Sequence, residues 1–109
     1  MTSKRKSVIQ HLESFKSILK QHFGERFSGL TLFGSYARDQ AKPDSDVDLL
    51  LILKNYSSEK DDYRELLPLI SGFLLESGVF ISLMIKSENE MKIQKEGLLR
   101  NISVEGIRI

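Results

Sequence analysis

The chain has 109 residues, which is enough for one domain with its own core and too few for two. Lysine and arginine (16 residues) outnumber aspartate and glutamate (15 residues) by only one, so the composition indicates no nucleic-acid partner. There is no cysteine, no apolar run longer than Leu49 to Leu53 and no signal-peptide pattern, so we expect a soluble cytoplasmic domain over residues 1–109, without a membrane partner.

The N-terminal third predicts a helix, a strand and a short helix. Apolar residues at three- and four-residue steps favour an amphipathic helix from Ser3 to His22, and Gly24 is placed to end it. These apolar residues are Ile9, Leu12, Phe15, Leu19 and Phe23. Leu30 to Phe33 lies between two glycines and predicts a buried strand. Ser35 to Asp39 is expected to begin a short helix, and Lys42 to Asp44 to form a loop.

The middle of the chain predicts two further strands around a long helix. Val47 to Leu53 is almost continuously apolar, as in a central strand. A helix is expected over Lys60 to Ser77, with a kink or a late start because Pro68 and Gly72 lie inside it. Its expected core residues are Leu66, Leu67, Ile70, Phe73 and Leu74. Val79 to Ile85 predicts the third strand.

The C-terminal part predicts one more helix and an edge strand. Ser87 to Glu90 has the pattern of a helix N-cap with acidic residues in the first turn. Met91, Leu98, Leu99 and Ile102 would line this helix, and Val104 to Ile109 would add a short strand. The fold class is therefore α/β (α+β), a small mixed β-sheet with helices mainly on one face and the other face open.

Strand alternation predicts which side chains point to the open face. Asp46 and Asp48 share a face with Leu50 and Ile52, because successive side chains of a strand point to opposite sides. The two aspartates lie about 6.5–7 Å apart at Cα, so both carboxylates can bind one metal ion or bridge two. They are our candidates for catalytic, metal-binding residues.

The preceding turn adds groups that bind phosphate. Gly34 lets the backbone approach a phosphate closely, and Ser35 offers both an N–H group and a hydroxyl. Arg38 lies one helical turn further and can add a guanidinium. Taken singly, Gly34-Ser35 is an ordinary turn, the two aspartates are a solvated strand start, and Arg38 beside Asp39 is a surface ion pair. Together, with ten residues between Ser35 and Asp46, they indicate nucleotidyl or phosphoryl transfer from a Mg²⁺-bound nucleoside triphosphate.

These residues resemble a known signature. Gly34-Ser35, ten further residues and Asp46-Val47-Asp48 resemble the DNA polymerase β-type nucleotidyltransferase superfamily, most closely its minimal MNT-type domains. The resemblance implies a nucleotidyltransferase fold and an enzyme that uses ATP and Mg²⁺. It further implies an antitoxin-like role, in which AMP is added to a tyrosine of a helical HEPN-type partner. Since the whole chain is needed for the core, such a partner or a second copy of the chain is expected to complete the site.

Two departures from this family leave the enzymatic function open. Asp39 stands where the family commonly has glycine, and Ser82 stands where it carries a third carboxylate; Glu88 or Glu90 could replace that carboxylate if their loop folds inward. A serine is a poor Mg²⁺ ligand and no general base, so we expect retained nucleotide binding and weakened or absent transfer. The first hypothesis is an adenylyl-transferring enzyme. The alternative is a catalytically degenerate binding module that neutralises or scaffolds a helical partner, and a third is a structural α/β domain.

Overall fold

A computed structural model describes residues 3–42, 44–55, 59–93 and 97–109. Helices and strands follow one another along the chain. In order they are α1 (Ser3–Phe23), the 3-10 turn η1 (Gly24–Arg26), β1 (Phe27–Phe33), α2 (Gly34–Ala37), β2 (Val47–Leu53), α3 (Glu59–Ser77), β3 (Ile81–Ser87), α4 (Glu88–Ile93), α5 (Leu98–Glu105) and β4 (Ile107–Arg108).

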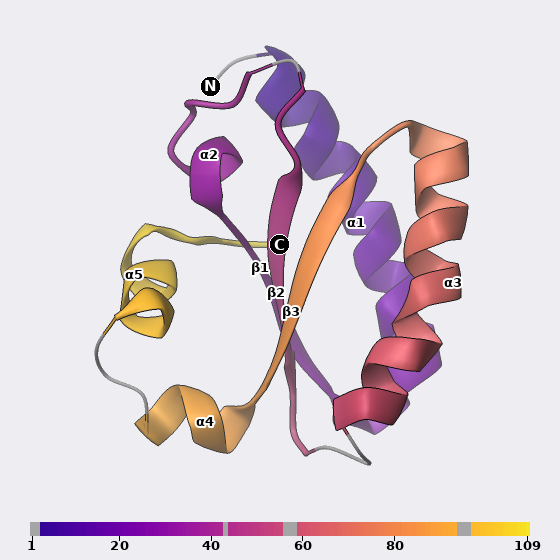
Figure 1. Cartoon of the computed structure of the whole chain (residues 1–109), viewed down its shortest axis with the longest axis vertical. Coiled ribbons are helices and arrows are strands. Elements are labelled where there is room, and N and C mark those ends of the chain that lie inside the picture. Colours follow the sequence, from indigo (N-terminus) through magenta and orange to yellow (C-terminus); the bar gives the residue numbers. More distant parts are fainter. Residues whose placement is uncertain (1–2, 43, 56–58, 94–96) are drawn as a thin grey trace.

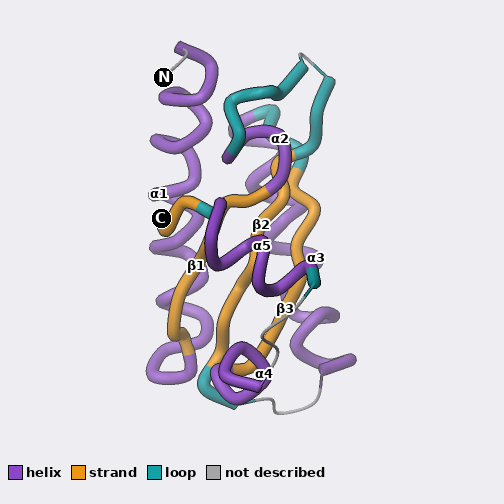
Figure 2. Tube along the Cα trace, turned by 90° about the vertical axis from the view of Figure 1, so that its left-hand side faces the viewer, coloured by secondary structure: helices purple, strands orange, loops and turns teal. Residues whose placement is uncertain are grey.

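The four strands form one mixed sheet with the order β3-β2-β1-β4. β1 pairs antiparallel with both β2 and β4, whereas β2 pairs with β3 in parallel. The long helices α1 and α3 lie on one side of the sheet, and α2, α4 and α5 lie on the other (Figure 1). Seen from that second side, the three short helices stand in front of the strands (Figure 2). The predicted fold class, a small mixed sheet with its main helices on one face, is confirmed.

The main core lies between the sheet and the two long helices. Helix α1 contributes its predicted apolar stripe, and β2 contributes the side chains that alternate away from its aspartates. Fully buried residues of this core include Leu12, Phe15, Leu19, Leu49, Leu51 and Leu53. Burial of a leucine or phenylalanine side chain stabilises by about 1.5–3 kcal/mol, so this side fixes the fold.

The second face of the sheet is covered in its middle, contrary to the expectation that it stays open. Leu50 is fully buried there, beneath Leu99 and Ile102 of α5. The correction has a simple physical reason. The predicted last helix is two helices, α4 and α5, and Gly97, the N-cap of α5, has φ +72°, a conformation that glycine adopts without the steric cost of a side chain.

Helix α3 also differs from its prediction. It is one continuous helix from Glu59, so the expected late start is wrong, and its Pro68 lies on the exposed side, where water can satisfy the carbonyl that proline leaves unpaired. Leu66 and Phe73 lie on the face of α3 that packs against the core and are buried as predicted. Leu67 lies beside that core-facing side and is 62% exposed.

Side-chain contacts complete several ends and edges. Ser87 and Glu90 form a reciprocal capping box, with Glu90 N–H donating to Ser87 Oγ and Ser87 N–H donating to Glu90 Oε1, both at 3.1 Å. On β3, an end strand of the sheet, the Ile85 N–H donates to the Tyr63 hydroxyl of α3 at 2.8 Å. The predicted loop at Lys42 to Asp44 includes residue 43, which is outside the described residues.

Among the described helices, none combines the length and the apolar character that a membrane span requires.

Candidate active site

The predicted phosphate turn and the predicted metal ligands meet at one end of the sheet. The register pairs Phe33, the last residue of β1, with Asp48 near the start of β2. Gly34 follows with φ +73°, and a Cβ built on it would collide with Asp48 Oδ2 and lie 3.1 Å from Asp48 Cγ. Only glycine therefore allows this turn to lie directly against the carboxylate.

The two aspartates carry like charges side by side. Asp46 is exposed just before β2, and Asp48 is half-buried as the second residue of that strand. Burial raises the pKa of the Asp48 carboxyl and the charge of Asp46 raises it further, while Arg38 acts in the opposite direction. Mg²⁺ prefers hard, negatively charged oxygen ligands, so this pair of carboxylates fits the ion that the sequence pattern implies.

Ser35 and Arg38 stand on either end of the short helix α2. Its four residues, Gly34–Ala37, make it shorter than the predicted Ser35 to Asp39. The Arg38 guanidinium is 3.8 Å from Glu105 on α5, and its Nε donates to Gln40 at 3.3 Å. Arg38 also lines a small hollow of about 100 Å³ together with Gly34, Asn101 and Glu105. No local pattern in the sequence predicts this contact, because 66 residues separate Arg38 from Glu105.

Ser82 lies beside the acidic pair, at the position that the resemblance implies for a third carboxylate. The parallel register pairs Asp48 directly with Ser82, which is exposed. Within the described ranges there is no group of three or more acidic, histidine or cysteine residues that could hold a metal ion. The site therefore offers two carboxylates and a hydroxyl.

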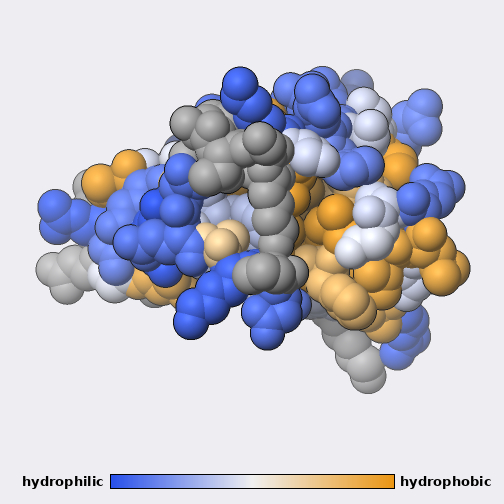
Figure 3. Space-filling view, turned by 90° about the horizontal axis from the view of Figure 1, so that it is seen from above, coloured by the Kyte–Doolittle hydropathy of each residue, from blue (hydrophilic) through white to orange (hydrophobic). Residues whose placement is uncertain are grey.

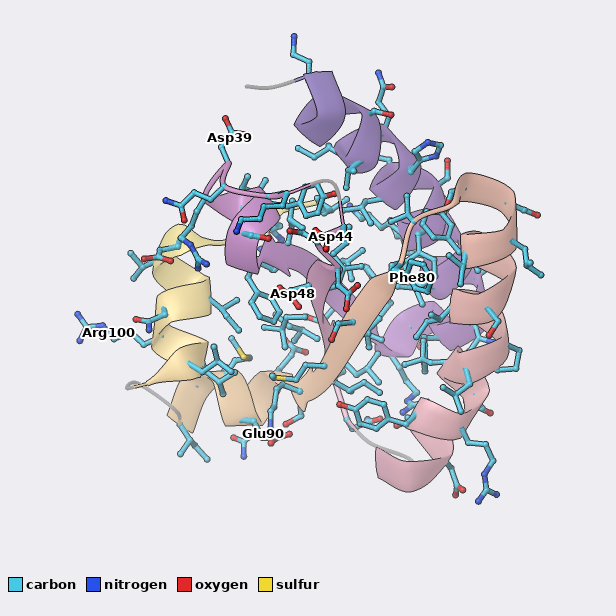
Figure 4. All side chains as sticks on the ribbon, turned by 45° about the horizontal axis from the view of Figure 1, so that its top comes forward. Asp39, Asp44, Asp48, Phe80, Glu90 and Arg100 are labelled. Carbon is cyan, nitrogen blue, oxygen red and sulfur yellow. The ribbon has the colours of Figure 1, made fainter. Side chains whose placement is uncertain are left out.

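Glu88 and Glu90 do not replace the third carboxylate. They follow the far end of β3, where Ser87 pairs with Leu53, five residues or about 16 Å from Ser82. Glu90 is also engaged in the capping box and in an ion pair with Lys86 at 3.5 Å. Figure 4 shows Glu90 at the opposite end of the strands from Asp48. The inward-folding alternative is therefore wrong.

The backbone conformation at Asp39 explains why the family pattern commonly has glycine at this position. Its φ is +56°, a left-handed conformation that glycine adopts freely and that aspartate tolerates better than most residues. Its side chain points outward, away from Asp48 (Figure 4). The added negative charge therefore points away from the turn at Gly34.

A glycine turn packed against a pair of carboxylates, at one end of a mixed sheet, is the arrangement that the sequence predicts for nucleotidyl transfer. Comparison with known families agrees, because residues 12–109 match the nucleotidyltransferase domain family. The chain belongs to that family.

Two archaeal relatives narrow the comparison. The protein adenylyltransferase MntA of Thermococcus cleftensis is 34% identical over 96 residues, which cover 81% of this chain and 87% of that protein. The candidate protein adenylyltransferase MJ1305 of Methanocaldococcus jannaschii is 34% identical over 84 residues, or 76% of this chain. The match spans only 57% of the length of MJ1305.

Two solved structures share the fold. A toxin–antitoxin crystal structure with AMP-PNP has a TM-score of 0.61 and 14% identity, over 88% of this chain and 70% of that one. A candidate nucleotidyltransferase from Sulfolobus solfataricus has a TM-score of 0.54 and 18% identity, over 95% and 77% of the two chains.

Proposed function

We propose that this domain is a Mg²⁺-dependent nucleotidyltransferase that transfers AMP from ATP to a hydroxyl group of a partner protein, in the manner of an antitoxin. The observation that carries the proposal is the close packing of Gly34 against the Asp48 carboxylate, with Asp46 beside it. An anion on the turn and a cation on the carboxylates would then share one small space. The names of the relatives, protein adenylyltransferases, favour AMP and a protein acceptor.

Each residue has a defined part in this reaction. The backbone at Gly34, the Ser35 hydroxyl and the Arg38 guanidinium bind the β- and γ-phosphates, so Arg38 must exchange Glu105 for phosphate oxygens. Asp46 and Asp48 would hold the Mg²⁺, which would supply Lewis-acid stabilisation of the charge that develops on the phosphates. The acceptor oxygen forms a bond to the α-phosphorus, the bond from that phosphorus to the bridging oxygen breaks, and pyrophosphate leaves in line.

Removal of the proton from the acceptor hydroxyl is the step for which the described residues of this site offer no evident base. A carboxylate in the place of Ser82 would accept it, whereas a serine hydroxyl is no base at neutral pH. The proton must then leave to water, and we expect slow transfer. This favours a second candidate function, a binding module that holds nucleotide and a helical HEPN-type partner without chemistry.

One pair of measurements tests the proposal. Titration calorimetry with MgATP gives heat of binding for the natural chain, and Asp46→Asn weakens that binding about 100-fold because a metal carboxylate is lost. Incubation with α-³²P-labelled ATP and the product of the neighbouring gene then labels that product, and Asp46→Asn abolishes the label. A tight complex without label would favour the binding module, and no heat with MgATP would overturn both functions.

A further inference from the structure

An exposed aromatic side chain lies immediately beside the acidic pair. Phe80 is 62% exposed, and its carbonyl accepts the Val47 N–H at 2.8 Å. Since Asp48 pairs with Ser82, the same parallel register places Phe80 next to Asp46. Exposure of a phenylalanine is costly, and this one serves no core.

Phe80 lines a pocket at this end of the described molecule, with a volume of about 360 Å³. This volume is in the range of sites that bind small molecules or single side chains. The other lining residues come from α1, α2, the approach to β2 with its first residue, and the approach to β3. They are Val8, Tyr36, Asp44, Ser45, Val47, Gly78 and Val79.

Viewed down on this end of the molecule, hydrophobic side chains gather on the right, the side on which α3 lies in Figure 1 (Figure 3). Asp44 and Phe80, which line the same pocket, lie near Asp48 at the heads of β2 and β3 (Figure 4). Among the described residues that line the pocket, Asp44 is the only charged one, and Asp46 follows two residues later. A pocket with apolar walls and an acidic rim is complementary to an apolar side chain that has a basic neighbour.

The in-line geometry of the proposed transfer indicates which reactant lies next to this pocket. Entering and leaving oxygens stand on opposite sides of the α-phosphorus. If pyrophosphate leaves on the turn at Gly34, at the end of β1, the acceptor enters from the other side of β2, over β3. Ser82 and Phe80 lie on that side.

We propose that the pocket beside Phe80 is the acceptor subsite, which receives a bulky apolar side chain of the acceptor protein with a basic residue next to it. This inference rests on the proposed function, because it assigns the same site a protein substrate. Phe80 and Asp44 then select the acceptor and do not contribute to nucleotide binding.

Two synthetic decapeptides test the proposal. Both contain a central tyrosine, flanked in one by leucine and lysine and in the other by alanine and glutamate. Each is titrated into ¹⁵N-labelled protein with MgATP present. We expect the leucine–lysine peptide to bind at least about tenfold more tightly, a difference of about 1.4 kcal/mol, and to shift the amide signals of Ser45, Val79 and Phe80.

Variants locate the binding. Phe80→Ser should weaken the binding of the leucine–lysine peptide about tenfold, and Asp44→Asn about threefold, with MgATP affinity within twofold of its natural value. The matched control is Leu67→Ser, since Leu67 is also 62% exposed but lies outside the pocket; it should change neither affinity.

Three results would overturn the inference. The first is equal or undetectable binding of both peptides, and the second is peptide binding that Phe80→Ser leaves unchanged. In the third, Phe80→Ser weakens MgATP about tenfold, and the pocket then holds the nucleobase. Failure of the proposed function itself is distinguishable, because MgATP would then give no heat with the natural chain.

Discussion

Two acidic sites at opposite ends of the same sheet differ in how their charge is compensated. Asp62, on α3, is 1% exposed, and its Oδ2 accepts a hydrogen bond from Arg26 Nη2 at 2.7 Å. Arg26 also donates to the Asn55 carbonyl at 3.1 Å, near the end of β2. At the head of β2, Asp48 faces the like charge of Asp46, and the pKa of its carboxyl is raised.

The difference separates a structural acid from a functional one. A buried carboxylate that is paired with an arginine makes the fold depend on both partners, because removal of one leaves the other charge buried and uncompensated. A pair of carboxylates in repulsion costs stability until a cation arrives, and such pairs are typical of binding and catalytic sites. The four predictions below test this contrast.

The largest effect is expected at the structural end. Arg26→Met leaves the buried Asp62 carboxylate without its cation and should lower the free energy of unfolding by about 3 kcal/mol, or Tm by more than about 10 °C. Asp62→Asn should cost less, because Arg26 is 28% exposed and can be hydrated. Thermal unfolding followed by circular dichroism checks both. An equal loss of unfolding free energy in the two variants would contradict the view that the buried Asp62 carboxylate needs Arg26 more than Arg26 needs Asp62.

Gly34→Ala should destabilise by about 2 kcal/mol, part from the left-handed backbone and part from the collision with Asp48. In an Asp48→Ala background the collision with the carboxylate disappears and only the 3.2 Å contact with Cβ stays, so the cost should fall to about 1 kcal/mol. Denaturant unfolding of the four proteins in this cycle measures the coupling.

Gly72→Ala is the matched control for that cycle. A Cβ at Gly72 meets nothing within 4 Å, inside helix α3. It should therefore stabilise by about 0.5–1 kcal/mol. A zero coupling between Gly34 and Asp48 would show that the turn does not press on the carboxylate.

Ser82→Asp should raise the rate of AMP transfer about tenfold, because it restores a carboxylate beside Asp48 that can bind metal and accept the proton. The measurement is labelled transfer to the acceptor protein, with Ser82→Asn as an uncharged control of equal size. If Ser82→Asp binds MgATP normally but transfers no faster, the third carboxylate does not belong at this position.

The smallest effect concerns Asp48 itself. Because folding raises the pKa of its carboxyl, the folded state holds the proton more tightly than the unfolded chain, and ionisation costs stability. Asp48→Asn should therefore raise Tm at pH 7 without metal, by about 2 °C after allowance for solvent screening. This gain should shrink as the pH falls and the natural Asp48 is protonated. A variant less stable than the natural chain at pH 7 would contradict the sign.

Sequence periodicity predicted most of this fold because the signals were local. Strand β2 and its alternating faces follow from Val47 to Leu53, and the capping box follows from Ser87 and Glu90. The division of the last helix could have been suspected at Gly97, but its consequence could not. That Leu99 and Ile102 cover Leu50 depends on where the chain goes after the turn, which no short window encodes.

The site was predictable to the same extent. Gly34, Ser35, Asp46 and Asp48 lie within 15 consecutive residues, so their spacing and strand alternation already indicated a common site. The roles assigned to these residues and to Ser82 remain predictions. The contact of Glu105 with Arg38 and the pocket beside Phe80 arise from pairing between distant segments, and they needed the fold.

The hydrogen bond from the Ile85 N–H to the Tyr63 hydroxyl bears on how the molecules behave at high concentration. An end strand offers unpaired backbone groups to which a strand of another molecule can add, and this route leads to filaments. Because the Tyr63 hydroxyl occupies the Ile85 N–H, a strand of another molecule could form backbone hydrogen bonds only with the part of β3 that precedes Ile85. The same helix that packs against the core thereby also blocks part of this strand edge.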